Sequence, residues 1–410
     1  MTNRVTMKSK TLLAVAAFAT ASVTALALSG CSGNGGQSPT GDAGGTIKIG
    51  AVMPLTGPLA ALGAGDKEAA EQAVADINKA GGINGRQVEL TVADDKTDPT
   101  ESVKQFNQMA ADNSYSAMLA SSMTSAAAAV SSSITQYKIP TIALSPVDQY
   151  VDGSNPYAFT SPGNTAIYAA ALVDYWKANG VKTVAVAYTG TDLYGQNGEK
   201  STKSLAEAAG MNIVLDEAYD PAATDFTPLI TKVVAAKPDA FVQWGSGPAP
   251  VIITKQIAGK GVPFYVTGSQ ASNLWLEPSG DAAEGVIGAT TAALDPDSLP
   301  DGAYKDLVMA VAQPWRDQNK GVNPPEFAYG GATAIELLKN AIEKAGSTDR
   351  GKIRDALEAT DLLTPNGHYH YSKSDHMGLD ASAIGIMVVK DGVWKATDWQ
   401  VDKFKTDAPK

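Results

Sequence analysis

Short apolar runs alternate with longer amphipathic stretches along most of this 410-residue chain, and this alternation constrains its fold more than any single motif. Runs such as residues 88–92 and 240–244 have the length of buried strands, whereas residues 165–179 carry apolar side chains at helical spacing. Glycine directly after a helical stretch, as at Gly210, is typical of a helix end. Strands and helices that alternate with short connections predict parallel sheets covered by helices, so we expect an α/β protein.

The pattern predicts the following elements. Strands are expected at residues 46–52, 88–92, 183–188, 213–216, 240–244, 264–267 and 383–389. Helices are expected at residues 67–80, from 100 onwards, and at 165–179, 194–209, 226–236, 250–258, 328–344 and 352–359. Residues 54–65 are expected to form a loop, and Asp391-Gly392 a hairpin turn. The length of the chain is sufficient for two domains. Ligands of parallel sheets lie outside the carboxyl ends of the strands.

The first 30 residues have the order of a secretory signal, with a basic start, an apolar run at 12–28 and small residues after it. The sequence L-S-G-C at 28–31 looks like the bacterial lipobox, in which the cysteine is lipidated. Cys31 is the only cysteine, so it has no partner for an intramolecular disulfide, and we predict that it carries the lipid. A plain signal peptide with a chance cysteine is the alternative. Residues 31–46 are rich in Gly and Ser and predict a flexible tether.

The net charge argues against nucleic acid as a partner. The chain carries −11 at pH 7, and removal of the three basic residues of the signal segment would leave about −14. An acidic exterior repels a phosphate backbone. The content of 44% hydrophobic and 18% charged residues is that of a globular protein, neither membrane-spanning nor disordered.

Residues 119–146 read as a strand end, a serine-rich turn, a helix and a second short strand. Ser121, Ser122 and Thr124 precede an alanine run, where oxygens that cap a helix are favoured. Small hydroxyl residues and free backbone N–H groups at a strand end also form a plausible cradle for a carboxylate. The local sequence leaves both interpretations open.

Motifs of catalysis and of cofactor binding are incomplete or missing. There is no G-x-S-x-G sequence. Residues 195–202 resemble a phosphate-binding loop, but Glu199 replaces the required glycine. Residues 63–68 begin like a dinucleotide-binding motif and lack its third glycine. We therefore expect no enzyme activity and no cofactor.

Two clusters of residues contain possible metal ligands, but no metal is expected. His368 and His370 would share one face of a strand, near His376, and such an arrangement suits a metal. No cysteine and no H-E-x-x-H helix accompany them, so a polar exposed hairpin is the preferred interpretation. The acidic residues of the turn at 94–98 lack the spacing and the glycine of an EF-hand. We expect them to cap the helix that follows.

Several stretches together resemble a known family. They are I-K-I-G-A-V-M-P-L-T-G-P at 47–58, E-Q-A-V-A-D-I-N-K-A-G-G-I-N-G at 71–85, D-D-K-T-D-P at 94–99, L-A-S-S-M-T at 119–124, Tyr194-Gly195, Lys255-Gln256 and A-Y-G-G-A at 328–332. With this order of elements, the chain is similar to the lipid-anchored substrate-binding proteins of ABC importers. More narrowly, it resembles the leucine/isoleucine/valine-binding type, which has the type I periplasmic-binding fold.

The resemblance implies two doubly wound, Rossmann-like lobes joined by a three-strand hinge that closes around a small ligand. Lobe 1 would comprise residues 47–163 and 291–382, and lobe 2 residues 164–290 and 383–410. The family holds the ligand's carboxylate with the serine turn and with the segment after the next strand. The corresponding positions here are Ser121, Ser122, Ser145, Pro146 and Val147.

Lobe 2 of the family supplies a tyrosine that closes over the ligand, here Tyr194, and an acid that pairs with the ligand's ammonium group. In this chain Gln270 stands in place of that acid, and Val147 in place of a threonine. A buried ammonium group without a carboxylate is costly. Either another acid substitutes, with Asp148 the nearest candidate, or the ligand has no ammonium group. Trp244 is expected to pack against an apolar or aromatic ligand, with core packing as the alternative.

We therefore expect a monomeric, non-enzymatic binding protein that is lipid-anchored on the extracytoplasmic face of the cell membrane. It would capture a small organic ligand, by family default a branched-chain or related amino acid, and deliver it to an ABC permease. The alternatives are a receptor for an amide, urea or an aromatic carboxylate, and a ligand sensor for a signalling partner.

Overall fold

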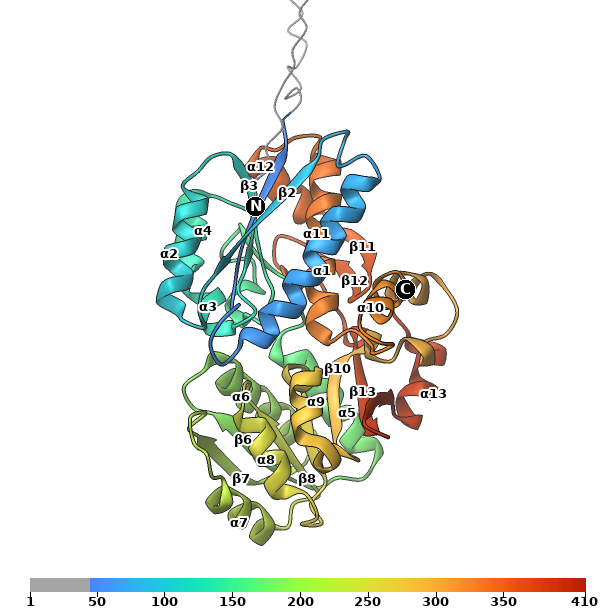
Figure 1. The fold of residues 1–410 in the computed structure, drawn as a ribbon. Coiled ribbons are helices and arrows are strands. Elements are labelled where there is room, and N and C mark those ends of the chain that lie inside the picture. Colours follow the sequence, from blue (N-terminus) through green and yellow to red (C-terminus); the bar gives the residue numbers. More distant parts are fainter. Residues whose placement is uncertain (1–44) are drawn as a thin grey trace, which may run out of the picture. The chain divides into compact units, whose positions relative to one another are not determined.

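A computed structural model describes residues 45–410, which belong to the unit Asp42–Lys410 (Figure 1). The predicted signal segment at 1–30, the predicted lipidation site Cys31 and nearly all of the predicted tether at 31–46 lie outside the described residues. Among the helices of residues 45–410, none has both the length and the apolar character that a membrane crossing requires.

The first sheet is entirely parallel, with the strand order β2-β1-β3-β4-β5. Its strands are β1 (Ile47–Met53), β2 (Val88–Asp94), β3 (Tyr115–Ala120), β4 (Thr141–Ala143) and β5 (Ala158–Thr160). Because successive side chains of a strand point to opposite faces, Ala51 and Val52 of β1 belong to two different apolar clusters. The sheet is therefore buried on both faces.

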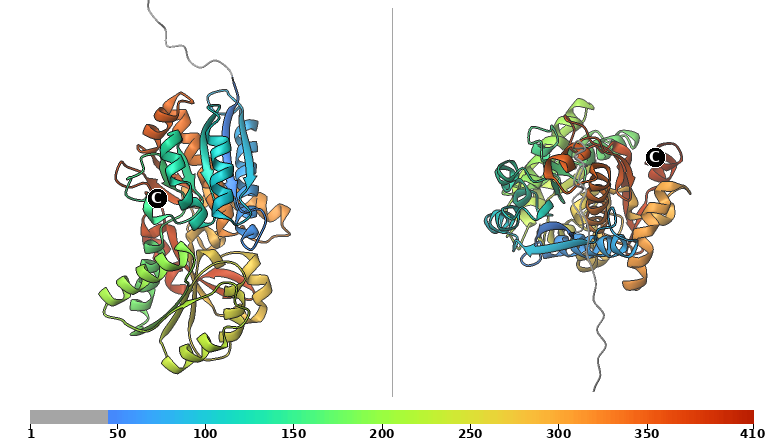
Figure 2. Two further views of the ribbon diagram at one scale, coloured as in Figure 1. Left: turned by 90° about the vertical axis from the view of Figure 1, so that its left-hand side faces the viewer. Right: turned by 90° about the horizontal axis from the view of Figure 1, so that it is seen from above.

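Three helices cover each face of the first sheet (Figures 1 and 2). On one face lie α1 (Ala60–Lys79), α11 (Glu326–Ala345) and α12 (Arg350–Leu357). On the other lie α2 (Pro99–Ala110), α3 (Thr124–Ala129) and α4 (Ser131–Tyr137). The first face thus combines an early helix with two helices from late in the chain.

The second sheet has seven strands in the order β14-β13-β10-β9-β8-β6-β7. They are β6 (Thr183–Thr189), β7 (Asn212–Tyr219), β8 (Ala240–Trp244), β9 (Phe264–Thr267), β10 (Ile287–Thr291), β13 (Ile384–Lys390) and β14 (Val393–Ala396). The five strands from β10 to β7 are parallel, whereas β13 and β14 are antiparallel to their neighbours. One face packs against α5 (Thr165–Ala178) and α6 (Leu193–Ala208). The other packs against α7 (Thr227–Ala236), α8 (Ala249–Ile257) and α9 (Asn273–Ser279).

The remaining elements connect or flank these layers. They are α10 (Ala303–Gln318), the hairpin β11 (Asp361–Thr364) and β12 (Gly367–His370), α13 (Asp398–Asp407), and the short 3-10 helices η1 (Asp148–Tyr150), η2 (Gly268–Gln270), η3 (Gly280–Ala283), η4 (Ala292–Leu294), η5 (Pro296–Ser298) and η6 (Ala381–Ala383). The chain passes from one sheet to the other after β5, after β10 and before β13. These three passages match the predicted hinge.

Arg350, the first residue of α12, joins three distant segments of the first layer. Its guanidinium donates hydrogen bonds to the carbonyl oxygens of Ala110 (3.1 Å), Asp112 (2.9 Å), Tyr115 (3.0 Å) and Tyr137 (3.1 Å). Carbonyls at the end of a helix have no partner within that helix, so these bonds satisfy groups that would otherwise need water. The last turns of α2 and α4 are thereby fixed beside β3.

Most predicted elements are confirmed, but α10, β5 and β10 were not predicted. The predicted loop over 54–65 is correct for residues 54–59 and wrong for 60–65, because helix α1 starts at Ala60. The serine turn does not cap α3, because its N-cap is Met123, which makes no side-chain capping bond. The turn at Asp391-Gly392 is confirmed, since both residues have positive φ (53° and 72°) between antiparallel β13 and β14.

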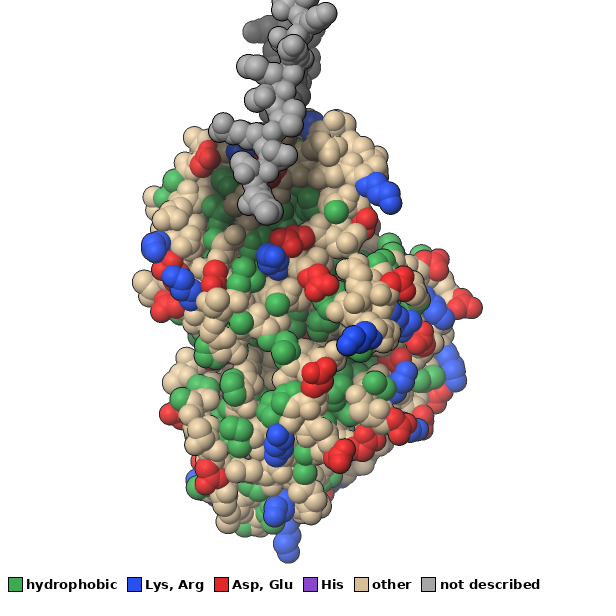
Figure 3. All heavy atoms as spheres, in the orientation of Figure 1, with side chains coloured by type: hydrophobic (Ala, Val, Ile, Leu, Met, Phe, Trp, Pro, Cys, Tyr) green, Lys and Arg blue, Asp and Glu red, His purple; other side chains and the backbone are tan. Residues whose placement is uncertain are grey.

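Charged side chains of both signs are interspersed on the face of the molecule in Figure 3. They are most frequent over α10 and α13, on the right of that view. On the described atoms of this face, acidic side chains interrupt the basic ones throughout. A phosphate backbone would therefore find no continuous basic stripe on this face.

Candidate functional site

A cavity of about 620 Å³, its open mouth included, lies where the carboxyl ends of parallel strands from both sheets converge. Segments that follow β3, β4, β5, β6, β8 and β9 contribute to its lining, together with the first turns of α1 and α11. This is the position in which α/β sheets bind ligands. The cavity is therefore the candidate ligand site.

Three carboxyl groups line the cavity: Asp66 of α1, Asp192 at the start of α6, and Glu326 at the start of α11. The lining residues that the structure describes include no Lys, Arg or His. Several of the others are apolar, among them Leu59, Leu62, Met123, Leu144 and Phe327. The cavity thus offers acidic acceptors at some points and an apolar surface at others.

Asp66 is fully buried on the side of the first sheet. Its Oδ2 accepts a hydrogen bond of 2.6 Å from the hydroxyl of Ser122, while Oδ1 has no partner among the described residues. A Cβ at Gly330 would lie 3.2 Å from Oδ1, so the glycine leaves room beside it. Burial raises the pKa of Asp66 well above its ordinary value, against the opposing effects of Ser122 and of the Gly331 backbone N–H, and the nearby Glu326 raises it further. Oδ1 is thus a buried acceptor on this side of the cavity.

Glu326 has both carboxyl oxygens occupied. Its Oε1 accepts a hydrogen bond from the Tyr168 hydroxyl, and its Oε2 accepts one of 2.8 Å from the backbone N–H of Thr291. Burial raises the pKa of Glu326 to about 7, although both hydrogen bonds lower it. A Cβ at Gly268 would lie 2.8 Å from Cδ of Glu326, so any larger residue there would displace the Glu326 carboxyl group. The side chain changes charge near neutral pH.

Asp192 joins segments that pack on different sheets. Its Oδ1 accepts a hydrogen bond of 2.7 Å from Ser125 of α3, and Ser125 Oγ accepts one of 3.2 Å from the N–H of Leu193. Burial raises the pKa of Asp192, and the Ser125 bond opposes this effect. This carboxyl group therefore closes one side of the cavity and is held in place by the first layer.

Two tyrosines form part of the wall formed by the second layer, and one of them was predicted. Tyr194 lines the cavity, its hydroxyl lies 2.7 Å from Oγ1 of Thr267, and its ring packs at 5.4 Å against Trp244. Tyr168 lines the cavity as well and was not predicted. Trp244 lies behind Tyr194, fully buried, with its Nε1 donating to Thr202 Oγ1 at 2.9 Å. The described lining does not include Trp244.

The two serines of the predicted carboxylate cradle donate hydrogen bonds from their hydroxyl groups to acidic side chains of the protein. Ser121 is buried; its hydroxyl donates to Asp95 at 2.5 Å and accepts from the N–H of Met123 at 3.1 Å. Ser122 does line the cavity, but its hydroxyl donates to Asp66. Because both protons are already donated, each hydroxyl would have to exchange its partner to bind an anionic ligand.

The segment after β4 is only partly in the wall. Pro146 lines the cavity, whereas the Ser145 hydroxyl donates at 2.9 Å to the carbonyl oxygen of Ser121. Val147 is buried in the apolar cluster under α2 and α3. Asp148, the predicted substitute acid, accepts a hydrogen bond of 3.1 Å from the hydroxyl of Thr165 and is absent from the described lining.

Gln270 is buried in η2 and also lies outside the lining. Its amide donates at 2.7 Å to the carbonyl oxygen of Gly245 and accepts from the N–H of Thr267 at 3.4 Å. The side chain holds the loop after β8 against the loop after β9. Its neighbours Gly268 and Ser269 form the wall in its place.

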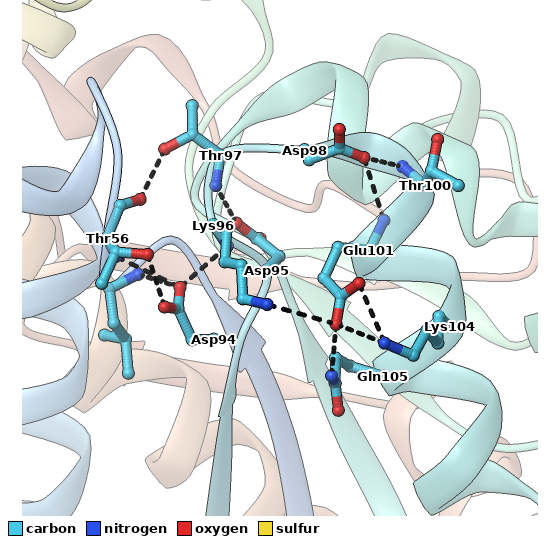
Figure 4. Close-up of polar contacts among 11 residues, drawn as sticks. Thr56, Asp94, Asp95, Lys96, Thr97, Asp98, Thr100, Glu101, Lys104 and Gln105 are labelled. Carbon is cyan, nitrogen blue, oxygen red and sulfur yellow. Dashed lines mark hydrogen bonds and ion pairs between the residues drawn. The ribbon is translucent and has the colours of Figure 1, made fainter.

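The acidic turn after β2 is used structurally, as the sequence predicts for Asp98 (Figure 4). Asp98 caps α2 by accepting from the N–H groups of Thr100 (2.7 Å) and Glu101 (3.0 Å). Asp94 accepts from the backbone and hydroxyl of Thr56, at 3.1 and 2.6 Å. Asp95 accepts from Ser121 instead. The turn therefore braces the serine segment from behind.

Comparisons with known proteins agree with this architecture. Residues 46–392 match the family described as periplasmic binding protein. The Leu/Ile/Val-binding protein homolog 1 of Brucella abortus (strain 2308) is 28% identical over 326 residues, which cover 78% of this chain and 84% of that protein. The leucine-, isoleucine-, valine-, threonine-, and alanine-binding protein of Pseudomonas aeruginosa is 26% identical and covers 80% of this chain and 86% of its own length.

A solved structure described as an extracellular ligand-binding receptor from Rhodopseudomonas palustris superimposes with a TM-score of 0.80. The two chains are 27% identical, and the match covers 86% of this chain and 99% of the other. The family match, over residues 46–392, includes all the described residues that line the cavity.

Proposed function

Because this chain belongs to the periplasmic binding protein family, we propose that it is the solute-binding component of an ABC importer. It captures one small organic ligand in the cavity and delivers it to a membrane permease. In this proposal the protein acts as a monomer without catalysis, held outside the cell membrane by a lipid on Cys31. Lobe 1 (47–163 and 291–382) and lobe 2 (164–290 and 383–410) close around the ligand by rotating about the three passages.

The ligand we propose is an amino acid with an apolar side chain, branched-chain or closely related. One observation supports it above others: Asp66, Asp192 and Glu326 line the cavity, and no described lining residue carries a cationic side chain. A ligand's ammonium group would supply the missing positive charge and fill the free acceptor Oδ1 of Asp66. The two curated relatives are named for binding leucine, isoleucine and valine, which supports the same class.

The positions of the carboxyl groups also change which residues we propose to hold the ligand's ammonium group. The sequence suggested Asp148, or a ligand without ammonium, because Gln270 replaces the acid expected in lobe 2. We propose instead that Asp66 and Glu326 take this role, since both line the cavity and Asp148 does not. The ligand's carboxylate remains assigned to the Ser122 side, and the apolar residues around Leu62 would contact its side chain.

Three ligands with the same isobutyl group test the proposal by calorimetry on the purified protein. Leucine carries both charged groups, 4-methylpentanoate lacks the ammonium group, and 3-methylbutylamine lacks the carboxylate. Leucine should bind at least 100-fold more tightly than 4-methylpentanoate, because the carboxyl groups of the cavity face no cation when 4-methylpentanoate is bound. Acetamide, urea and benzoate cover the alternative classes. Tighter binding of 4-methylpentanoate or benzoate than of leucine would overturn the proposal.

A further inference from the structure

The β11–β12 hairpin carries a cluster of metal-binding side chains that the ligand cavity does not use. The strands pair antiparallel, with Asp361 opposite His370 and Leu363 opposite His368. Residues two apart on a strand point to the same side, so His368 and His370 lie together with Asp361 on the outer face. The residue between them, Tyr369, points inward and is fully buried.

The inward face anchors the hairpin. The Tyr369 hydroxyl donates to the carbonyl oxygen of Ser161 and accepts from the amide of Asn366 at 3.2 Å. Asn366 also donates at 3.2 Å to the Ser161 carbonyl. A strand held by buried bonds on one face presents the side chains of its other face at a fixed spacing.

The three outer side chains are already close to a coordination geometry. Nε2 of His368 lies 2.7 Å and Nδ1 of His370 lies 3.4 Å from Oδ1 of Asp361, and the two imidazole rings are 4.0 Å apart. One ligand atom from each residue lies within 4.8 Å of the others. Around a tetrahedral zinc ion with bonds of about 2.1 Å, ligand atoms are separated by roughly 3.4 Å, so small side-chain rotations suffice.

We propose that Asp361, His368 and His370 form a surface site for a divalent transition-metal ion of the zinc, copper or nickel type. Two imidazole nitrogens and one carboxylate oxygen suit these ions, whereas calcium and magnesium prefer oxygen ligands alone. The side chains of His370 and Asp361 are 57% and 70% exposed, so an ion can enter from solvent. Water would complete its coordination. A hydrogen bond between His368 and Asp361 alone, without an ion, is the alternative explanation of their short distance. The experiment below distinguishes a metal site from this hydrogen bond.

The test uses the full chain without a histidine tag and adds ZnCl₂, CoCl₂ or CaCl₂ in separate titrations. Binding of one Zn²⁺ per chain is expected by calorimetry, with visible absorption bands of bound Co²⁺ and no response to Ca²⁺. His368→Ala and His370→Ala should each weaken Zn²⁺ binding at least tenfold and abolish the Co²⁺ bands. Asp361→Asn should weaken it less, because an amide oxygen can still coordinate.

Asp301→Asn is the matched control, because Asp301 is an exposed acid on a different segment, paired with Lys305. It should leave Zn²⁺ affinity unchanged. His370 and Asp361 are exposed and His368 is half-buried, so circular dichroism verifies that each variant is folded. Zn²⁺ binding that survives both histidine substitutions, or no binding at millimolar Zn²⁺, would overturn the proposal. Leucine binding by the same samples is independent of this outcome.

Discussion

The hydroxyl of Ser122 donates a hydrogen bond of 2.6 Å to Oδ2 of Asp66, and this bond ties the turn after β3 to α1. The serine faces a carboxyl group of the protein, although the sequence suggested that it would face one of the ligand. Because Asp66 is buried, the bond contributes to the stability of the ligand-free protein as well as to the cavity wall.

Substitution Ser122→Ala removes the only hydrogen bond that Asp66 accepts from a side chain of the described protein. The free energy of unfolding should fall by about 1–2 kcal/mol, because the carboxyl group stays buried with less compensation. Urea denaturation measures the change. Ser374→Ala, at an exposed serine, is the control and should change stability by less than about 0.5 kcal/mol. Equal effects of the two substitutions would contradict the role of the bond.

The raised pKa of Glu326 predicts a stability that falls with rising pH. The pKa is about 7 in the folded protein and 4.5 when unperturbed, so between these values the folded state binds more protons. Ionisation of Glu326 has no effect on the free energy of unfolding below pH 4.5. It lowers this free energy by roughly 3 kcal/mol by pH 7, and the effect stays constant above pH 7.

Glu326→Gln removes this titration, and its amide can still bond Tyr168 and the Thr291 N–H. Relative to the unmodified protein, the variant should therefore gain stability as the pH rises from 5 to 8, as measured by urea denaturation at each pH. The exposed Glu277→Gln serves as the comparison and should follow the unmodified protein at every pH. A pH-independent difference for Glu326→Gln would show that Glu326 does not titrate in this range.

Gly268→Ala should disturb the cavity through Glu326. The new methyl group would lie within van der Waals contact of the carboxyl group, which has to move away from Tyr168. We expect a loss of about 1–3 kcal/mol in unfolding free energy and weaker leucine binding. Gly45→Ala, whose Cβ would have no neighbour nearer than 3.9 Å, is the control for calorimetry and denaturation. Unchanged leucine affinity in Gly268→Ala would remove Glu326 from the ligand site.

Arg350→Ala should destabilise the first layer by about 2–4 kcal/mol, because backbone carbonyls of three segments lose a charged donor. Lysine presents one ammonium group in place of a planar fork, so Arg350→Lys should restore only part of the loss. Thermal denaturation compares both with Lys352→Ala, an exposed position on the same helix. Full recovery by lysine would mean that charge alone, and not the geometry of the fork, is required.

The local pattern predicted most of the fold, because buried strands and amphipathic helices are encoded over ten to fifteen neighbouring residues. Residues 183–188 and 240–244 appear as β6 and β8 with nearly the predicted bounds. Helix α1 was predicted to begin too late, since its first two turns contain Gly63 and Gly65, which disfavour a helix in isolation. Gly63 lies against the backbone of Pro54 and Gly65 against the side chains of Pro325 and Phe327, so tertiary packing overrides the local preference.

Of the residues predicted for the ligand site, Tyr194, Ser122 and Pro146 line the cavity. Asp66 and Glu326 were missed, because they are 260 residues apart and meet only where α1 packs on α11. One signal was available: a Cβ at Gly331 would lie 2.8 Å from Cα of Asp66, so the paired glycines after Glu326 mark the close approach of two helices.

The bonds of Arg350 and the late helices of the first layer determine when this protein can fold during synthesis. Strands β1 to β5 emerge within the first 160 residues, yet α11, α12 and Tyr369 are needed to cover one face of their sheet. Contacts this distant in sequence form slowly, and the uncovered face is prone to aggregate. The nascent N-terminal half should therefore depend on holding factors until roughly nine-tenths of the chain is available, and a fragment that ends after β5 should be insoluble.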